Sequence, residues 1–487
     1  MDRLHPLESM HSVIRNALPN ITVESINPLP SYRLLRFFSI KISDGRTLIL
    51  SLPPPPTLRL LRSERAASVS ESLLTKWLLE GALQAPIQAG GSIQDKADYH
   101  PTTEIQLKQD NLKVSSKETI NLKEDVLRFL PILVAYSLSS TELGSPFNIF
   151  EPTRGVPLSK LPTPLTTPER KVIDLERGQL IRRLSNFTSP NGVFGPVTGV
   201  INTQLPTADT HGTQLANQSF RGARTWKHAF HSLLESVLRD AEDMAVTISY
   251  EPIRGYFNRL GYLLDGIKIA RLVLLDAGDD SNVLVSRLKE SAEEEDRTQP
   301  QPMLSQETKT IKTEAASEKN QEDKGGRPPD SQRPVLTVTG LRDWSNCIFG
   351  DPLFAEAFNQ DPSPEFLRGF RESQEYDTSG GESKKASKDG SDNLVEDCEN
   401  VPGRLLLYEC YHATVAVVKQ FYRPGPNSSD REITARRRLA TALKRLQEVE
   451  EEAAGKRPRR PSANVEAWPV KKSRGDKDSP IPSVEDE

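Results

Sequence analysis

The sequence predicts a two-lobed α+β protein, with a small strand-rich N-terminal lobe and a larger helical C-terminal lobe. Strand patterns dominate residues 21–52 and return around 130–160. Helical patterns dominate the region from about 167 to 270. The order is therefore strands with one helix, a linker, and then mostly helices that carry a small hairpin, which is an α+β layout.

Composition narrows the class of protein. The chain has 487 residues, of which 36% are hydrophobic, 6% aromatic and 27% charged, with 37 prolines. This is too polar for one continuous globule and predicts a folded body with disordered inserts. The net charge of -4 gives no overall basic field, so we expect no specific nucleic-acid binding. Three cysteines without metal-ligand spacing favour a reducing compartment.

The N-terminal lobe is expected over residues 1–155. The runs "LLRFFSIKI" and "RTLILSL" are rich in strand-forming residues and are joined by "SDG", a short hairpin signal. The "PPPP" at 53–56 ends the second strand, because proline cannot donate to a sheet. Residues 63–83 then show a helical pattern, and the polar residues 86–122 are expected to form a disordered insert.

The helical lobe is expected over residues 156–425. Its helical patterns cover about 167–187, 224–245 and 253–270. Two charged stretches that cannot bury a core are expected to be disordered inserts, at 290–333 and 373–400.

An acidic loop lies in "LVLLDAGDDSNVLVS", residues 272–286, which reads as two short apolar strands on either side of the loop. The return strand of the hairpin that this loop opens is "PVLTVTGLRDW", residues 334–344. Acidic groups and an amide between strands suit a divalent metal or a proton acceptor. They suit a solvated turn equally well, because turns use Asp, Asn and Gly.

The C-terminal part divides into a helix at 429–455 and a disordered basic tail at 456–487. Within the tail, "KRPRR" and "KKSR" have the form of a bipartite nuclear import signal, so residues 456–474 could bind an import receptor. A generic solubilising or polyanion-binding tail is the alternative. The start has no apolar run of signal-peptide length, and the apolar stretch 405–422 carries charged residues. We expect an intracellular protein, nuclear or cytoplasmic, with no membrane span.

Several separated segments, taken in order, resemble the aminoglycoside phosphotransferase-like branch of the protein-kinase-like fold, and most of all the fungal proteins that carry this domain. They are "DGRTLILSL" with "SERAASVSESLLTKWL", the segment "RGVPLSKLPTPLTTPERKVIDLERGQLIRRL", the acidic loop and "VTGLRDWSNCIFGDPLF". The resemblance spans about residues 20–425 without the inserts. It implies transfer of phosphate from ATP, with Mg²⁺, to the hydroxyl of a small-molecule acceptor that the sequence does not identify.

The resemblance assigns four residues. Asn282 and Asp343 match the magnesium ligands of the family, and Asp351 matches the structural aspartate of its Gly-Asp-Pro motif. Glu71 matches the helix glutamate that organises the small lobe around the nucleotide.

Other positions depart from the family pattern. Ser51 stands where the phosphate-binding lysine is expected, and Lys41, Arg59 and Arg62 are the other cations nearby. Ala277 stands where the catalytic aspartate is expected. Prolines also occupy the place of the glycine-rich phosphate loop, in residues 26–35.

Asp276, one residue before Ala277, is the displaced candidate for the catalytic base. On an extended strand such a shift turns the side chain to the opposite face, unless a distortion at Gly278 restores its direction. The departures favour a second hypothesis, a catalytically impaired pseudokinase that binds a ligand or a protein. The retained Asn282 and Asp343 favour nucleotide binding.

Overall fold

A computed structural model describes most of the two expected lobes. The described residues are 7–30, 34–83, 126–140, 142–201, 222–287, 336–371 and 394–453. The inserts expected at 86–122 and 290–333, and the basic tail at 456–487, lie outside the described residues.

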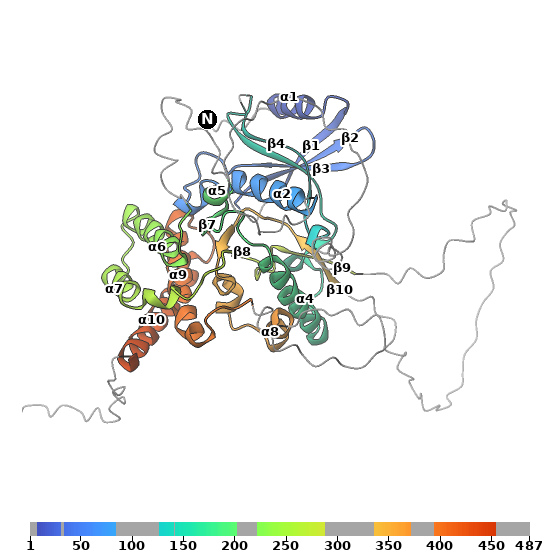
Figure 1. Cartoon of the computed structure of the whole chain (residues 1–487). Helices are drawn as coiled ribbons and strands as arrows, with labels where there is room; N and C mark the ends of the chain where they lie inside the picture. The colour runs from blue at the N-terminus through green and yellow to red at the C-terminus, as the bar shows by residue number, and fades with distance from the viewer. Residues whose placement is uncertain are drawn as a thin grey trace, which may run out of the picture.

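The N-terminal region is built on a five-stranded antiparallel sheet in the order β1-β2-β3-β5-β4 (Figure 1). The helix α1 (Leu7–Ala17) lies on one face of the sheet, and α2 (Ala67–Leu83) lies on the face toward the helical region. The strands are β1 (Val23–Leu29), β2 (Arg36–Ile42), β3 (Thr47–Leu52), β4 (Ile132–Ser140) and β5 (Ser145–Glu151).

The strand β3 shows how the sequence positions a site residue. Leu48, Leu50 and Leu52 alternate along the strand and are buried in the cluster that also holds Met10 of α1. Because neighbouring side chains on a strand point to opposite faces, Ser51 points toward α2 instead. The tight turn before β3 uses Gly45, whose φ of +86° is a conformation that favours glycine.

The C-terminal region is mostly helical (Figure 1). Thr166 and Glu169 form a capping box at the start of α4, and α9 packs along α10. The helices are α4 (Thr167–Ser185), α5 (Val197–Val200), α6 (Trp226–Asp243), α7 (Tyr250–Leu260), α8 (Pro364–Arg371), α9 (Val401–Tyr422) and α10 (Ser428–Ala453).

The acidic loop joins strands of two different sheets. The preceding strand β8 (Arg271–Leu274) pairs with β11 (Cys347–Gly350), beside β7 (Gly195–Pro196). The following strand β9 (Val283–Arg287) pairs with β10 (Leu336–Leu341) and with β6 (Val156–Pro157). The hairpin of β9 and β10 agrees with the expected return strand. The loop therefore crosses between two three-stranded sheets.

Two sequence expectations need correction. The helical pattern at 253–270 ends early, as α7 and a short 3₁₀ turn (Gly261–Leu264), and the chain beyond the turn is held by Glu396, which accepts the backbone N–H groups of Lys268 and Ile269. Residues 394–400 were expected to belong to a disordered insert, but they are part of the folded body. Their 3₁₀ turn Cys398–Asn400 leads directly into α9.

A buried ion pair holds the segment that follows β11 against α9. Nε of Arg404 donates to Oδ2 of Asp351 at 3.0 Å, and the side chains are 0% and 1% exposed. The hydroxyl of Tyr408 donates to the same carboxylate at 2.8 Å and accepts from Nε1 of Trp226 at 2.7 Å. Asp351 thus has the structural role that the sequence resemblance implies.

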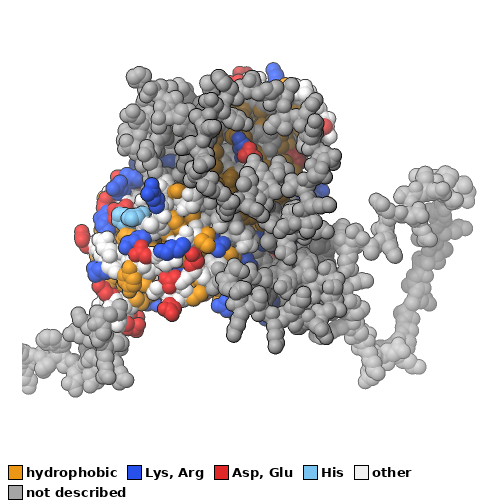
Figure 2. Space-filling model, in the orientation of Figure 1, with side chains coloured by type: hydrophobic (Ala, Val, Ile, Leu, Met, Phe, Trp, Pro, Cys, Tyr) orange, Lys and Arg blue, Asp and Glu red, His pale blue; other side chains and the backbone are white. Residues whose placement is uncertain are grey.

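The described surface is mixed in charge. Figure 2 shows acidic and basic side chains interspersed over the visible part of the helical region. Among the described helices, none has the length and apolar character needed to cross a bilayer.

Candidate functional site

The acidic loop changes direction immediately after β8, and this decides where its side chains point. The N–H of Asp279 donates to the carbonyl of Asp276 at 3.1 Å, and the N–H of Asn282 donates to that of Asp279 at 2.8 Å. Because these are turns, the alternation of an extended strand does not reach Asp276. Ala277 is 2% exposed and packs into the core, and Asp276 lines a cavity.

Asn282 connects Asp276 to Asp343. Its Nδ2 donates to Oδ1 of Asp276 at 3.3 Å and to the carbonyl of Asp343 at 3.2 Å. Its Oδ1 accepts the N–H of Asp343 at 2.9 Å. Asn282 and Asp343 are 0% and 2% exposed and Asp276 is half-buried, so the buried Asn282 joins two carboxylates that line the cavity.

The helix α4 anchors the loop through two arginines. Arg177 and Arg170 reach Asp280 at 3.1 and 2.9 Å, and Nη2 of Arg177 donates to the carbonyl of Gly278. Burial lowers the pKa of Arg177, although the charge of Asp280 opposes this. Asp280 therefore serves as an anchor for the loop, and its charge is already matched by two cations.

Gly278 has a different role from the one considered from the sequence. It is not among the described glycines with positive φ. A Cβ atom there would lie 2.9 Å from the Cβ of Ala357 and 3.2 Å from its Cα. The glycine therefore allows the loop to pack closely on the segment after β11, and the turns themselves direct Asp276.

Glu71 and Ser51 meet where the family pattern places a glutamate and a lysine. Oγ of Ser51 donates to Oε2 of Glu71 at 3.2 Å, and Nδ2 of Asn148 donates to the same atom at 3.0 Å. Burial and the nearby charge of Asp343 raise the pKa of Glu71 to about 8, against hydrogen bonds from Asn148, the Trp344 backbone and Ser51. This environment favours the protonated, neutral form of Glu71.

The other cations near Ser51 do not replace the lysine. Lys41 is exposed on β2 and does not line the cavity. Nη1 of Arg59 lies 3.1 Å from the sulfur of Met244, and Nη1 of Arg62 pairs with Asp240 at 2.5 Å.

The segment in place of a glycine-rich loop is tied to the strand that leads to Asp343. Residues 31–33 of this segment lie outside the described residues. Nη2 of Arg342 donates to the carbonyl of Pro30 at 3.0 Å, and its guanidinium lies 5.5 Å from the ring centre of Phe37. Arg342 directly precedes Asp343, so its side chain links the N-terminal sheet to this part of the site.

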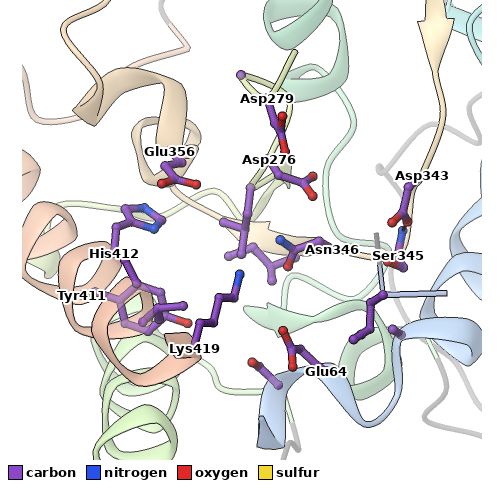
Figure 3. Close-up of a pocket in the computed structure, with 18 of the residues that line it drawn as sticks. Glu64, Asp276, Asp279, Asp343, Ser345, Asn346, Glu356, Tyr411, His412 and Lys419 are labelled. Carbon is purple, nitrogen blue, oxygen red and sulfur yellow. Dashed lines mark hydrogen bonds between the residues drawn. The ribbon is translucent and has the colours of Figure 1, made fainter. Parts of the chain in front are cut away.

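A cavity of about 1220 Å³ opens between the acidic loop, the start of α2 and the helices α9 and α10. Figure 3 shows Lys419 extending from α9 into this cavity, with Tyr411 and His412 on the same helix. The sequence interpretation took residues 405–422 as a buried or half-buried helix and gave these three residues no role in the site. The four-residue spacing of Tyr411, Val415 and Lys419, which puts them on one helix face, is the signal that could have found them.

Two oxygen donors of this site suit a magnesium ion: the carboxylate of Asp343, which lines the cavity, and Oδ1 of the buried Asn282, which also accepts the N–H of Asp343. No group of three His, Cys, Asp or Glu side chains in the described chain has the arrangement of a metal site. Magnesium commonly takes one or two carboxylates from the protein and completes its shell with water and substrate phosphates. Asp343 and Asn282 would hold it, and its charge would neutralise phosphate oxygens. Among the described residues, by contrast, none of Lys41, Arg59 and Arg62 supplies a cation at Ser51 for a nucleotide phosphate.

Comparisons with known proteins give a structural likeness only. No protein-family model and no curated protein sequence matches the chain. Among solved structures, a candidate aminoglycoside phosphotransferase from Ralstonia eutropha is 9% identical with a TM-score of 0.44, over 91% of this chain and 98% of that one. A candidate fructosamine-3-kinase from Thermobifida fusca is 11% identical with a TM-score of 0.42, over 88% and 99%.

The streptomycin–ATP complex of APH(2")-IIa is 9% identical with a TM-score of 0.39, over 92% of this chain and 97% of that one. The similar structures are thus aminoglycoside phosphotransferases and other small-molecule kinases. TM-scores below 0.5 at such identities decide neither family nor activity, so any functional conclusion has to come from the site.

Proposed function

We propose that this protein is a phosphotransferase that uses ATP and magnesium to phosphorylate a hydroxyl group of a small molecule. The observation that carries the proposal is the constellation of Asp276, Asn282 and Asp343. Asn282 contacts the carboxylate of Asp276 at 3.3 Å and both backbone groups of Asp343. One amide thus fixes a proton acceptor beside a magnesium ligand.

Each residue has a separate role in this proposal. Asp276 accepts the proton of the acceptor hydroxyl, because it lines the cavity that an acceptor would enter. Asp343 and Asn282 hold magnesium. Asn282 also orients Asp276, since its Nδ2 donates to that carboxylate. Glu71 lies behind Asp343 and is coupled to it by charge.

A non-catalytic, ligand-binding pseudokinase is the second candidate function. The contact between Ser51 and Glu71 favours it, because a hydroxyl cannot neutralise a phosphate. Ala277 does not add to this argument, since Asp276 takes the place beside Asn282. The two candidates therefore differ in whether magnesium alone suffices to neutralise the nucleotide.

The decisive measurement is the thermal unfolding midpoint of the full chain with ATP, with and without magnesium, in the wild type and in Asp343→Ala. A ligand at free concentration c that binds only the folded state stabilises it by RT ln(1 + c/Kd), so the midpoint rises with ligand concentration. We expect a magnesium-dependent rise in the wild type and none in Asp343→Ala. No such rise in the wild type would contradict the proposal. If ATP binds, phosphate transfer to a panel of hydroxyl compounds separates the enzyme from the pseudokinase.

The basic tail leads to a separate proposal about location. Residues 456–474 have the form of a bipartite import signal, so we propose that they bind an import receptor and direct the protein to the nucleus. A reporter fused to residues 450–487 should enter the nucleus, and should stay in the cytoplasm when the lysines and arginines of 456–474 are replaced. A cytoplasmic wild-type reporter would exclude this role.

A further inference from the structure

The cations around the cavity differ in whether their charge is already matched. Four arginines that line it are paired within the protein: Arg62 with Asp240 at 2.5 Å, Arg170 with Asp280 at 2.9 Å, Arg423 with Glu64 at 2.6 Å and Arg438 with Glu409 at 2.9 Å. Within the part of the chain that the structure describes, Lys419 has no ion-pair partner. Lys419, together with Arg431 at the exposed start of α10, is thus a lining cation that a ligand can engage without breaking an ion pair among the described residues.

Lys419 also lies in the right place to contact a ligand. Its side chain is half-buried, and Figure 3 shows it pointing into the cavity toward the wall that carries Asp276 and Asn346. Removing an ammonium group from water without an anionic partner costs free energy, so a bound anion would stabilise it. The apolar side chains of Val415 and Leu275 line the same cavity and would contact the carbon skeleton of a ligand.

The cavity has carboxylates on both sides: Glu64 pairs with Arg423 of α9, the charge of Glu356 acts on His412 of α9, and a second group lies on the opposite wall. Asp276, Asp279 and Asp343 belong to the acidic loop and to the segment after β10, which form the opposite wall. In the proposed function Asp343 faces magnesium and Asp276 faces the reacting hydroxyl. The wall formed by α9 faces the remaining part of the acceptor.

We infer that the acceptor is an organic anion: a hydroxyl compound whose phosphate or carboxylate group binds Lys419 while its hydroxyl group faces Asp276. The identity of the reacting hydroxyl rests on the proposed function, but the anion site itself does not. Glu356 and Asp430 also line the cavity, and together with the opposite wall they would suit a cationic acceptor. The charge of the ligand is therefore the quantity to measure.

The test uses four probes with the same three-carbon skeleton and different charge: glycerol 3-phosphate, glycerate, glycerol and 3-amino-1,2-propanediol. Thermal unfolding of the full chain is followed during titration with each probe, without nucleotide. We expect glycerol 3-phosphate, glycerate or both to raise the unfolding midpoint as their concentration increases, as binding to one site requires. Glycerol and the amine should raise the midpoint less. The anion with the higher affinity shows whether the site prefers a phosphate or a carboxylate group.

Variants locate the binding. Lys419→Met should weaken binding of the preferred anion by about tenfold or more, because a charge-assisted hydrogen bond is lost. Lys419→Arg should retain most of the affinity. The matched control is Lys444→Met on α10, where the side chain is exposed and does not line the cavity. It should bind the anion as the wild type does.

Two results with the wild type would overturn the inference: no saturable binding of either anion, or binding of the amine at least as tight as that of the anions. Two results with the variants would also overturn it: an anion affinity that is unchanged in Lys419→Met, or a loss of anion affinity in Lys444→Met equal to that in Lys419→Met. A further arm adds ATP and magnesium. If Lys419→Met abolishes the ATP response and leaves anion binding intact, Lys419 binds the donor nucleotide and the inference is wrong. If the wild type binds anions but gives no ATP response, the proposed function fails and the anion site stands.

Discussion

The Oγ atom of Ser51 donates a hydrogen bond to Oε2 of Glu71 at 3.2 Å, at the place where a kinase-like small lobe would hold a lysine–glutamate ion pair. The partners of Glu71 are neutral: the Ser51 hydroxyl, the Asn148 amide and the Trp344 backbone. Burial and the charge of Asp343 therefore raise its pKa to about 8. The missing lysine changes the protonation of a buried acid next to the proposed magnesium ligand.

The first prediction concerns the stability of the protein as a function of pH. The pKa of Glu71 is raised from 4.5 to about 8, so the folded state keeps a proton that the unfolded chain releases. The resulting stabilisation is complete below about pH 4.5 and is lost as pH rises to about 8. Glu71→Gln cannot ionise and keeps a similar shape. The unfolding midpoint of the wild type should thus fall relative to Glu71→Gln between about pH 5 and 8.

Glu448 provides the control for this experiment, because it is exposed on α10. The difference between the wild type and Glu448→Gln should not change with pH over the same range. A constant difference between the wild type and Glu71→Gln would contradict the raised pKa.

The second prediction is that Ser51→Lys increases the affinity for ATP and magnesium by about tenfold relative to Ser51→Met. The amine would pair with Glu71, favour its ionised form and neutralise a phosphate. The measurement is the ATP titration of the thermal midpoint. The gain should disappear in the double variant Ser51→Lys, Glu71→Gln. Equal affinities of the lysine and methionine variants would argue against a nucleotide at this position.

The third prediction separates catalysis from binding. Asp276→Asn keeps a side chain that can contact Asn282 but cannot accept the hydroxyl proton. Phosphate transfer should fall by about 10²–10⁴-fold, the usual contribution of a general base, and the midpoint shift with ATP and magnesium should remain. Asp279, exposed on the same loop, gives the control Asp279→Asn, for which we expect a much smaller loss. If Asp276→Asn and Asp279→Asn reduced phosphate transfer equally, Asp276 would not be the general base.

The fourth prediction concerns the buried ion pair between α9 and the segment after β11. Arg404→Met leaves the Asp351 carboxylate buried without its cation, which should lower the free energy of unfolding by about 3–5 kcal/mol. Urea denaturation measures this loss. Adding Asp351→Asn should recover part of it, because the uncompensated charge is gone. Arg437→Met, at an exposed position of α10, should change stability by at most about 0.5 kcal/mol.

Sequence patterns were informative wherever the relevant interactions are local. The alternation in β3 and the capping box of α4 depend on neighbouring residues, and both elements lie close to their expected positions. The helix expected at 253–270 was too long: α7 ends at Leu260, and the segment beyond the following 3₁₀ turn contacts Glu396, which is remote in sequence. The same holds for residues 394–400, whose folding depends on contacts with Lys268, Ile269 and Arg404.

The chemical identity of the site residues is a property of the sequence alone: no packing can place a carboxylate at Ala277 or an amine at Ser51. Their consequences were decided by the tertiary structure. The turns after β8 bring Asp276 to Asn282, and burial beside Asp343 raises the pKa of Glu71. The packing of α9 places Lys419 in the cavity. These features depend on distance, burial and charge between remote segments, which local periodicity does not encode.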